Sequence, residues 1–332
     1  MSNTKIATPV IKPMALIAYH ANCIDGFMAA TIAADFMGLR DFGYTLVPMH
    51  YTPESESALL LEAGVIDYAE IYILDFSVSV DTLKELGSLG NTKVTLLDHH
   101  KTAFEKYFPN FIFTSTSYAN TSLHGVAIVL DNMLSGAGIA WRYFHPDVPA
   151  PALVRYVQDY DLWLYDFRDD TRYMNKYLQA LPLDVRVWMR EVSNAESSIA
   201  CLKDMLAVGK KLQAEHDKKV ADVVAKKFTI SIEEGLIFTV ECDDKSLVSD
   251  VGHRLAEINQ KFGCIAIGSS YSYTPEAATY TWSLRSIGDV DVSTIAKMHG
   301  GGGHKNAAGF TVSKEIHESL ILGAGDEGEQ TS

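Results

Sequence analysis

Acidic and imidazole side chains recur in the N-terminal part of the chain wherever a short apolar run ends. One group follows the run MALIAY, a second closes IYILDF, and a third follows KVTLLD. The candidate residues are His20, Asp25, Asp75, Asp98, His99 and His100. Carboxylates that lie close together repel one another, and a bound divalent cation removes that repulsion. Because carboxylate and imidazole together suit manganese, magnesium, iron or zinc, the pattern predicts a metal site if the chain brings these three groups together.

The elements that would bring them together can be read from the alternation of apolar runs and helix-like patterns. The predicted strands are 14–19, 45–50, 71–76 and 93–98, and the predicted helices are 26–38, 54–64 and 80–90. This alternation predicts an α/β fold with a doubly wound, mainly parallel sheet, in which ligands bind beyond the carboxyl ends of neighbouring strands. Taken singly, an aspartate at a strand end is most often a turn or helix-cap residue, but the coincidence at one sheet edge favours a metal site.

The rest of the chain predicts a second, smaller domain. From about residue 120 to 190 the pattern is helical, and 195–227 is a charged segment with few helix breakers. Strand patterns return from residue 228, which indicates an α+β domain with its own sheet. We therefore predict a metal-binding catalytic domain over 1–194, a connecting helix over 195–227, a second domain over 228–315 and a disordered tail over 316–332.

A run of glycines in the second domain is the other chemical signal. Successive glycines inside a folded domain indicate positive φ angles or the close approach of a ligand. We expect the run to form a turn that opens a short helix and offers backbone N–H groups to a phosphate. Nearby side chains could add donors to this anion site. The candidate substrate-binding residues are Gly301, Gly302, Gly303, His304, Lys305 and Arg285.

Composition limits the classes of function. The 332 residues carry 28 Lys and Arg against 42 Asp and Glu, a formal net charge of −14. Binding along duplex nucleic acid requires a basic face, so we expect no extensive duplex binding. No apolar run approaches the ~18 residues of a membrane span, and the start shows no secretory pattern. We expect a cytoplasmic protein that binds no membrane and whose four cysteines form no disulfide.

Four elements in order resemble the DHH/DHHA1 phosphoesterases. They are Asp25-Gly26, Asp75, the triplet Asp98-His99-His100 with the downstream YVQDYDLW, and the terminal GGGGHKNAAG. The resemblance runs from about residue 14 to 313, and it implies an N-terminal DHH domain, a C-terminal DHHA1 substrate-binding domain and two divalent metal ions, usually manganese. Family members are often dimers, so the resemblance also implies a homodimer.

The resemblance assigns roles residue by residue. Asp75 matches a ligand that bridges the two metals, and His20 matches an imidazole ligand of one of them. Asp98 and His100 match positions that either support the metal ligands or face the phosphate. Asp159 is preferred to its neighbour Asp161 as a ligand because it ends the helix PALVRYVQD. The expected metal ligands are thus His20, Asp25, Asp75, His99 and Asp159, and the expected catalytic residues are Asp75, Asp98 and His100. His304 and Arg285 match residues that hold the terminal phosphate or base of the substrate.

Cys23 departs from the family pattern. Members commonly carry aspartates at both positions of an Asp-x-Asp-Gly run, whereas this chain reads Cys23-Ile24-Asp25-Gly26. A thiolate could replace the carboxylate as a ligand and would favour zinc or iron. The other alternative is that one metal is bound weakly.

The expected activity is hydrolysis of a phosphoester by water activated between two metals. The acidic charge favours short substrates, namely oligoribonucleotides, dinucleotides or phosphoadenosine phosphate. The alternatives are a single-strand-specific exonuclease, a catalytically inactive nucleotide-binding sensor that retains the fold, and a polyphosphate or pyrophosphate hydrolase.

Overall fold

A computed structural model describes residues 12–322 in two units, which divide between Gln213 and Ala214. The N-terminal unit is built on a six-stranded sheet of order β2-β1-β3-β4-β6-β5. Its strands are β1 (Met14–His20), β2 (Gly43–Met49), β3 (Glu70–Leu74), β4 (Lys93–Asp98), β5 (Tyr118–Leu123) and β6 (Val126–Asp131). All neighbouring strands are parallel except β5 and β6. The predicted mainly parallel sheet is confirmed.

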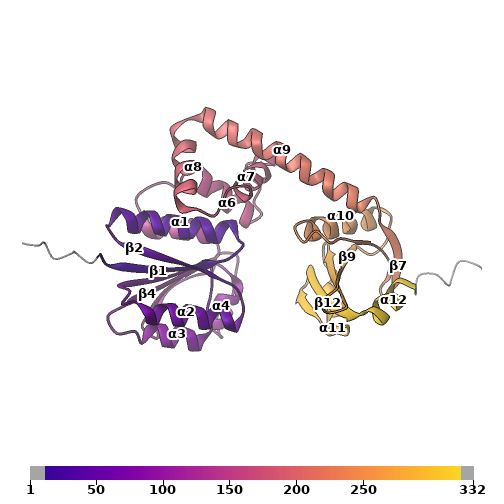
Figure 1. Ribbon diagram of the computed structural model, residues 1–332, viewed down its shortest axis with the longest axis horizontal. Coiled ribbons are helices and arrows are strands. Elements are labelled where there is room, and N and C mark those ends of the chain that lie inside the picture. Colours follow the sequence, from indigo (N-terminus) through magenta and orange to yellow (C-terminus); the bar gives the residue numbers. More distant parts are fainter. Residues whose placement is uncertain (1–11, 323–332) are drawn as a thin grey trace, which may run out of the picture. The chain divides into compact units, whose positions relative to one another are not determined.

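Helices cover both faces of this sheet, because its central strands are apolar on both sides. Along β1, Ala15 and Ile17 belong to one buried cluster, whereas Leu16 and Ala18 belong to another. The first cluster lies under α1 (Ile24–Leu39) and α5 (Gly136–Phe144). The second lies under α2 (Pro53–Val65), α3 (Val80–Gly87) and α4 (Lys101–Tyr107), on the opposite side of the sheet in Figure 1. The result is a three-layer α/β sandwich.

The hairpin of β5 and β6 corrects the expectation of a helical pattern from residue 120 onward. The segment VAIVLD that forms β6 is a short apolar run like the other buried strands, and it extends the parallel sheet beyond β4. The helical region begins only at α5. It continues through α6 (Ala152–Asp161), α7 (Asp169–Gln179) and α8 (Val185–Ser197), which add buried side chains to the α1 face.

A long helix, α9 (Ile199–Val224), occupies most of the segment expected to connect the domains. The division between the two units falls inside this helix. Its first half contributes Met205 to the core of the N-terminal unit, and its last turns contribute Val220 and Val224 to a core of the C-terminal unit. No helix in the described range 12–322 combines the length and the apolar composition that a membrane span requires.

The C-terminal unit has a six-stranded mixed sheet of order β11-β12-β10-β9-β8-β7. Only β8 and β9 are parallel neighbours. Buried residues of α10 (Val248–Lys261) pack in a cluster on one face of this sheet, and those of α11 (Val292–Met298) in another. The strands are β7 (Phe228–Ile232), β8 (Gly235–Glu241), β9 (Ile267–Thr274), β10 (Thr279–Ser286), β11 (Gly302–His304) and β12 (Ala307–Ser313).

Two expectations for this unit are wrong. The glycine run does not open a helix, because β11 pairs antiparallel with β12 in a tight hairpin. A Cβ at Gly301 would lie 2.2 Å from the carbonyl oxygen of Gly309, and Gly303 has a φ of 142°, so close packing and backbone conformation account for these glycines. The tail is also helical further than expected, since α12 spans Lys314–Leu322. Residues 323–332 of the expected disordered tail lie outside the described residues.

Candidate metal centre

The ends of three adjacent strands bring the N-terminal candidate residues together. Strands β1, β3 and β4 are neighbours in the sheet. His20 ends β1, Asp75 follows β3 directly, and Asp98 ends β4. Parallel strands end at the same edge, so these side chains and those that follow them meet there. We call the group of His20, Cys23, Asp25, Asp75, Asp98, His99, His100 and Asp161 the Asp75 cluster.

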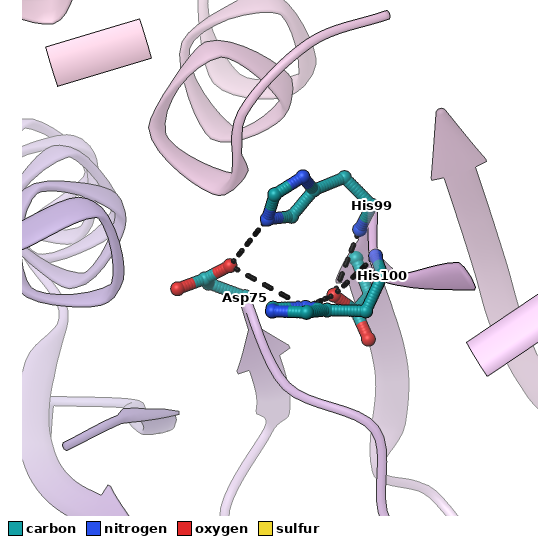
Figure 2. Close-up of side chains that lie close together, drawn as sticks. Asp75, His99 and His100 are labelled. Atoms are coloured by element: carbon teal, nitrogen blue, oxygen red, sulfur yellow. Dashed lines mark hydrogen bonds and ion pairs between the residues drawn. The ribbon is translucent and has the colours of Figure 1, made fainter. Parts of the chain in front are cut away.

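Asp75 lies at the middle of this cluster. Its carboxylate is 1% exposed, and its backbone has a φ of 54°, a left-handed conformation that aspartate tolerates better than most residues. His99 Nε2 lies 3.1 Å from Oδ1 of Asp75, and His20 Nδ1 lies 3.4 Å from Oδ2. His100 Nδ1 is 3.8 Å from Oδ1. Figure 2 shows the rings of His99 and His100 beside this carboxylate.

Several donor atoms of the cluster have no hydrogen-bond partner among the described residues. Within the described part of the chain, twelve buried side-chain nitrogen and oxygen atoms lack such a partner, and six of them lie here. They are His20 Nδ1, Asp75 Oδ1 and Oδ2, Asp98 Oδ2, His99 Nε2 and Asp161 Oδ2. An unsatisfied buried polar group costs about 1–3 kcal/mol, and more when charged. Six unpartnered atoms around one point therefore fit a site for cations.

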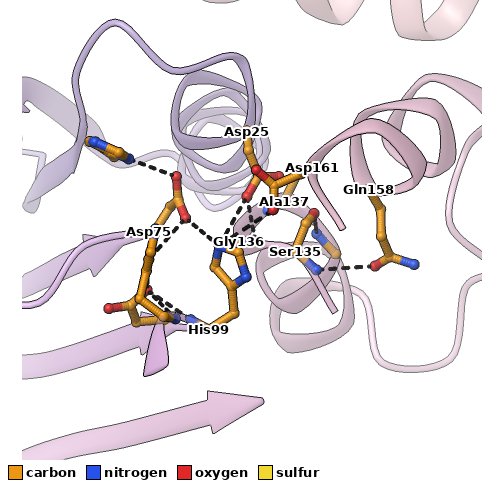
Figure 3. Close-up of polar contacts among 12 residues, drawn as sticks. Asp25, Asp75, His99, Ser135, Gly136, Ala137, Gln158 and Asp161 are labelled. Carbon is orange, nitrogen blue, oxygen red and sulfur yellow. Dashed lines mark hydrogen bonds and ion pairs between the residues drawn. The ribbon is translucent and has the colours of Figure 1, made fainter. Parts of the chain in front are cut away.

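Asp25, His99 and Asp161 form one side of the cluster. His99 Nε2 lies 3.5 Å from Asp161 Oδ2 and 3.9 Å from Asp25 Oδ2. The carboxylate of Asp25 is fixed from behind, because it accepts hydrogen bonds from the backbone N–H groups of Gly136 at 2.5 Å and Ala137 at 2.9 Å. Figure 3 shows these contacts at the beginning of α5. A helix N-terminus stabilises a carboxylate, so α5 orients Asp25 toward the cluster.

Two glycines allow the strands and helices to approach this closely. A Cβ at Gly136 would lie 2.4 Å from the Cβ of Asp75, and a Cβ at Gly26 would lie 2.4 Å from the carbonyl oxygen of His20. Gly26 is part of the Asp25-Gly26 motif, whereas no sequence motif predicted a role for Gly136. The available signal was Ser135-Gly136, separated by three residues from the end of the apolar run VAIVLD, since Ser135 caps α5 by accepting a hydrogen bond from Gly138 N at 3.2 Å.

Asp98 orients the residues that follow it. Its Oδ1 accepts hydrogen bonds from the backbone N–H groups of His99 at 2.7 Å and His100 at 3.2 Å, and it lies 2.7 Å from His100 Nδ1. Asp98 is fully buried, whereas the side chain of His100 is one-third exposed. The bond to Nδ1 leaves Nε2 of His100 as the ring nitrogen that a ligand could contact.

The structure corrects the preference for Asp159 over Asp161. Asp161 belongs to the cluster, whereas Asp159 does not. The buried carboxylate of Asp159 accepts hydrogen bonds from Asp166 N at 2.8 Å, from Phe167 N at 3.3 Å and from the hydroxyl of Thr171. Asp159 therefore holds the loop between α6 and α7, and its oxygens are already satisfied.

Cys23 faces a different part of the cluster. Its Sγ forms a set with the donor atoms of His20 and Asp75 in which all atoms lie within 4.8 Å of one another. Burial, together with the charges of Asp75 and Asp25, raises the pKa of the Cys23 thiol. The neutral thiol is thus the stable form in the metal-free cluster.

In the metal-free cluster, closely spaced carboxylates and imidazoles shift one another's pKa values. Burial lowers the pKa of His99, but the contact with Asp75 and the charges of Asp25 and Asp161 outweigh burial and raise it to about 10. Burial and the neighbouring carboxylates raise the pKa of Asp25. For Asp75, burial acts in the same direction, yet contacts with His20 and His99 lower its pKa overall. A divalent cation would replace the shared protons as counter-charge.

The candidate substrate residues of the C-terminal unit have their own contacts. Arg285 donates from Nε to Ser249 Oγ at 3.2 Å and from Nη1 to the carbonyl oxygen of Leu284 at 2.8 Å. Lys305 pairs with the exposed Asp289 at 2.8 Å. His304 contributes its backbone to β11 opposite Ala307. Arg285 is partly buried and its pKa is lowered by burial, which leaves a cation that an anion could stabilise.

Comparisons with known proteins agree with this architecture. Residues 237–324 match the family described as DHHA1 domain. The chain is 28% identical over 309 residues to uncharacterized protein R106 of Acanthamoeba polyphaga mimivirus, covering 90% of this chain and 67% of that protein. It is 26% identical over 266 residues to oligoribonuclease NrnB of Bacillus subtilis (strain 168), covering 76% and 62%. The matches thus span about two thirds of these relatives' length.

Among solved structures, the exonuclease RecJ bound to manganese has the same fold. It aligns with a TM-score of 0.51 at 12% identity, covering 94% of this chain and 89% of that one.

Proposed function

The chain belongs to the DHH/DHHA1 phosphoesterase family, and we propose that it hydrolyses phosphoester bonds of short nucleotide substrates at two divalent cations held by the Asp75 cluster. The observation that carries the proposal is the convergence of unpartnered buried donors around Asp75. Asp75 offers two free oxygens, and each lies near a different imidazole, His99 or His20. A carboxylate of this kind can serve two cations at once.

The donor sets divide the ligands between two cations. Asp25, His99 and Asp161 would hold one, and His20 with Asp75 would hold the other, with Asp75 shared. When bound, the two cations supply an activated water and neutralise the charge that develops on phosphate oxygens. Manganese is the first choice because carboxylates and imidazoles predominate, and a RecJ of the same fold is described as bound to manganese.

His100 and Asp98 act beside the metal ligands in this proposal. Asp98 fixes the His100 ring through Nδ1 and through both backbone N–H groups of the triplet. The partly exposed His100 is then free to bind a phosphate oxygen through Nε2. Asp98 thus acts as a positioning residue, and His100 is the group that meets the substrate.

Short nucleotides are the proposed substrate class for two reasons. The net charge of −14 opposes a long track for a polyanion, and one relative is named an oligoribonuclease. In the C-terminal unit, Arg285, Lys305, His304 and the glycine hairpin of Gly301, Gly302 and Gly303 are the proposed anion-binding residues.

A manganese-supplemented hydrolysis panel tests the proposal. It compares oligoribonucleotides of increasing length, cyclic dinucleotides, phosphoadenosine phosphate, long single strands and polyphosphate. We expect the highest kcat/KM on the shortest oligonucleotides or on phosphoadenosine phosphate. A higher kcat/KM on long single strands or on polyphosphate would contradict the proposed class of short nucleotide substrates. Nucleotide binding by calorimetry without turnover under manganese, zinc or iron would instead indicate an inactive sensor.

Asp75→Asn is the variant that tests the site itself, because asparagine keeps the shape and tolerates the left-handed backbone at this position. We expect it to abolish metal-dependent turnover while the protein remains folded. Asp81→Asn is the matched control, since its carboxylate is exposed and forms an ion pair with the exposed Lys84, which lies on the same helix. Full activity in Asp75→Asn would contradict the proposed role of the cluster.

A further inference from the structure

We infer that Cys23 is a ligand of the cation held by His20 and Asp75, and that this half of the site takes a thiolate-preferring cation such as zinc, iron or cobalt. The inference rests on the proposed function, because it assigns the metal preference of the same site. It predicts that the two cations differ in kind, which the family resemblance does not imply.

The geometry places three different donor types around one point. The Sγ of Cys23, a ring nitrogen of His20 and a carboxylate oxygen of Asp75 all lie within 4.8 Å of one another. His20 Nδ1 and Asp75 Oδ2 are 3.4 Å apart, and both are buried without a hydrogen-bond partner. Asp75 is 99% buried, so solvent water does not reach its Oδ2 atom. A buried carboxylate oxygen of this kind needs a cation or a hydrogen-bond donor beside it.

Capping of α1 does not account for the thiol of Cys23. Cys23 is the N-cap residue of α1, where Ser, Thr, Asp or Asn usually bonds a backbone N–H, yet its side chain does not cap the helix. It is a free cysteine. Its extended backbone, with φ of −119° and ψ of 131°, leads out of β1 and into α1 beside His20.

The other half of the site has a different chemical character. Asp25, His99 and Asp161 offer two carboxylates and one imidazole. Carboxylate oxygens suit magnesium and manganese, whereas a thiolate favours zinc, iron and cobalt. Since the sets differ by the exchange of a carboxylate for a thiol, the structure predicts one oxygen-preferring position and one thiolate-preferring position.

Cobalt(II) substitution tests this inference by a readout that does not depend on activity. The full chain, stripped of metal, is titrated with cobalt while bound metal is counted and the near-ultraviolet spectrum is recorded. We expect two cobalt ions per chain and a sulfur-to-cobalt charge-transfer band. Cys23→Ser should lose the band, while Cys201→Ser, which changes a cysteine outside the cluster, should retain it.

Cys23→Asp provides the second variant, since it supplies a carboxylate in place of the thiol. We expect it to bind two manganese ions and to lower the affinity for zinc relative to manganese by about tenfold or more. Circular dichroism shows whether each variant is folded.

The outcomes separate the inference from the proposed function. Two bound cobalt ions without the band, or a band that survives Cys23→Ser, would overturn the inference and leave the metal site intact. An unchanged zinc-to-manganese preference in Cys23→Asp would also overturn it. Failure of the wild-type chain to bind any cobalt, zinc or manganese would overturn the metal site, and with it the proposed function.

Discussion

Gly136→Ala is the most direct test of how the fold holds the Asp75 cluster. An alanine Cβ at this position would lie 2.4 Å from Asp75 Cβ and 2.8 Å from Asp75 Oδ1. Asp75 is buried and follows β3 directly, so it cannot swing away into solvent. The backbone N–H that residue 136 donates to Asp25 is retained in the variant. The substitution therefore changes only the space beside Asp75.

The magnitude follows from this contact. Overpacking of a buried position usually costs about 1–3 kcal/mol of unfolding free energy. Displacement of a supporting group beside a metal ligand typically weakens metal binding by about 10–100-fold. Gly64→Ala is the matched control, because Gly64 lies in helix α2 and a Cβ there would meet nothing within 4 Å. That control should gain about 0.5–1 kcal/mol from the higher helix propensity of alanine.

Chemical denaturation of the metal-free proteins measures the first effect, and calorimetric titration with manganese measures the second. Gly136→Ala should be less stable than wild type and bind manganese more weakly, whereas Gly64→Ala should be more stable with unchanged binding. Wild-type manganese affinity and stability in Gly136→Ala would refute the role assigned to this close approach.

Three further predictions concern the site and the fold around it. Asp161→Asn should weaken manganese binding in calorimetry, whereas Asp159→Asn should mainly lower stability, by about 1–3 kcal/mol for lost buried hydrogen bonds. Equal losses of affinity would contradict the assignment of Asp161, and not Asp159, to the Asp75 cluster. Adding manganese at about 100 times its Kd to the chelated protein should raise the unfolding free energy by about 2.7 kcal/mol, and an unchanged melting curve would argue against a built site. Burial raises the pKa of Glu70, but hydrogen bonds from Arg40 and Tyr72 outweigh it and lower the pKa overall. The pair therefore stabilises the fold above the ordinary carboxyl pKa and loses its effect as pH falls through the lowered value, so Glu70→Gln should flatten the acid limb of a stability–pH curve.

The main sheet could be predicted because the apolar pattern that identifies each strand lies within the strand's own residues. The runs 14–19, 71–76 and 93–98 are each mainly apolar, as expected for strands buried on both faces, and acidic residues mark the ends of the last two. The location of His20, Asp75 and the triplet Asp98-His99-His100 at one edge followed from the topology alone. The hairpin at 118–131 escaped prediction because only its second strand is apolar, while β5 reads YANTSL and is largely exposed.

The features that escaped prediction depend on tertiary contacts. Asp159 and Asp161 are two residues apart on α6, so they project about 200° apart around the helix axis. Which of them faces the cluster is decided by how α6 packs, and sequence spacing does not contain that information. Gly136 is likewise explained only by the presence of Asp75 beside it. The glycine run suggested a turn that opens a helix, whereas it forms a hairpin in which the neighbouring strand β12 leaves no room for side chains at Gly301 and Gly303.

The way Asp25 is held has a consequence for how this protein could change over evolutionary time. Two of its partners, 111 and 112 residues away along the chain, are main-chain amides, which every amino acid except proline supplies. Mutation of either partner's side chain therefore cannot delete the donor. Substitutions at residue 137 other than proline therefore keep the hydrogen bond to Asp25. At residue 136 the hydrogen bond is also kept, but the space beside Asp75 excludes a side chain.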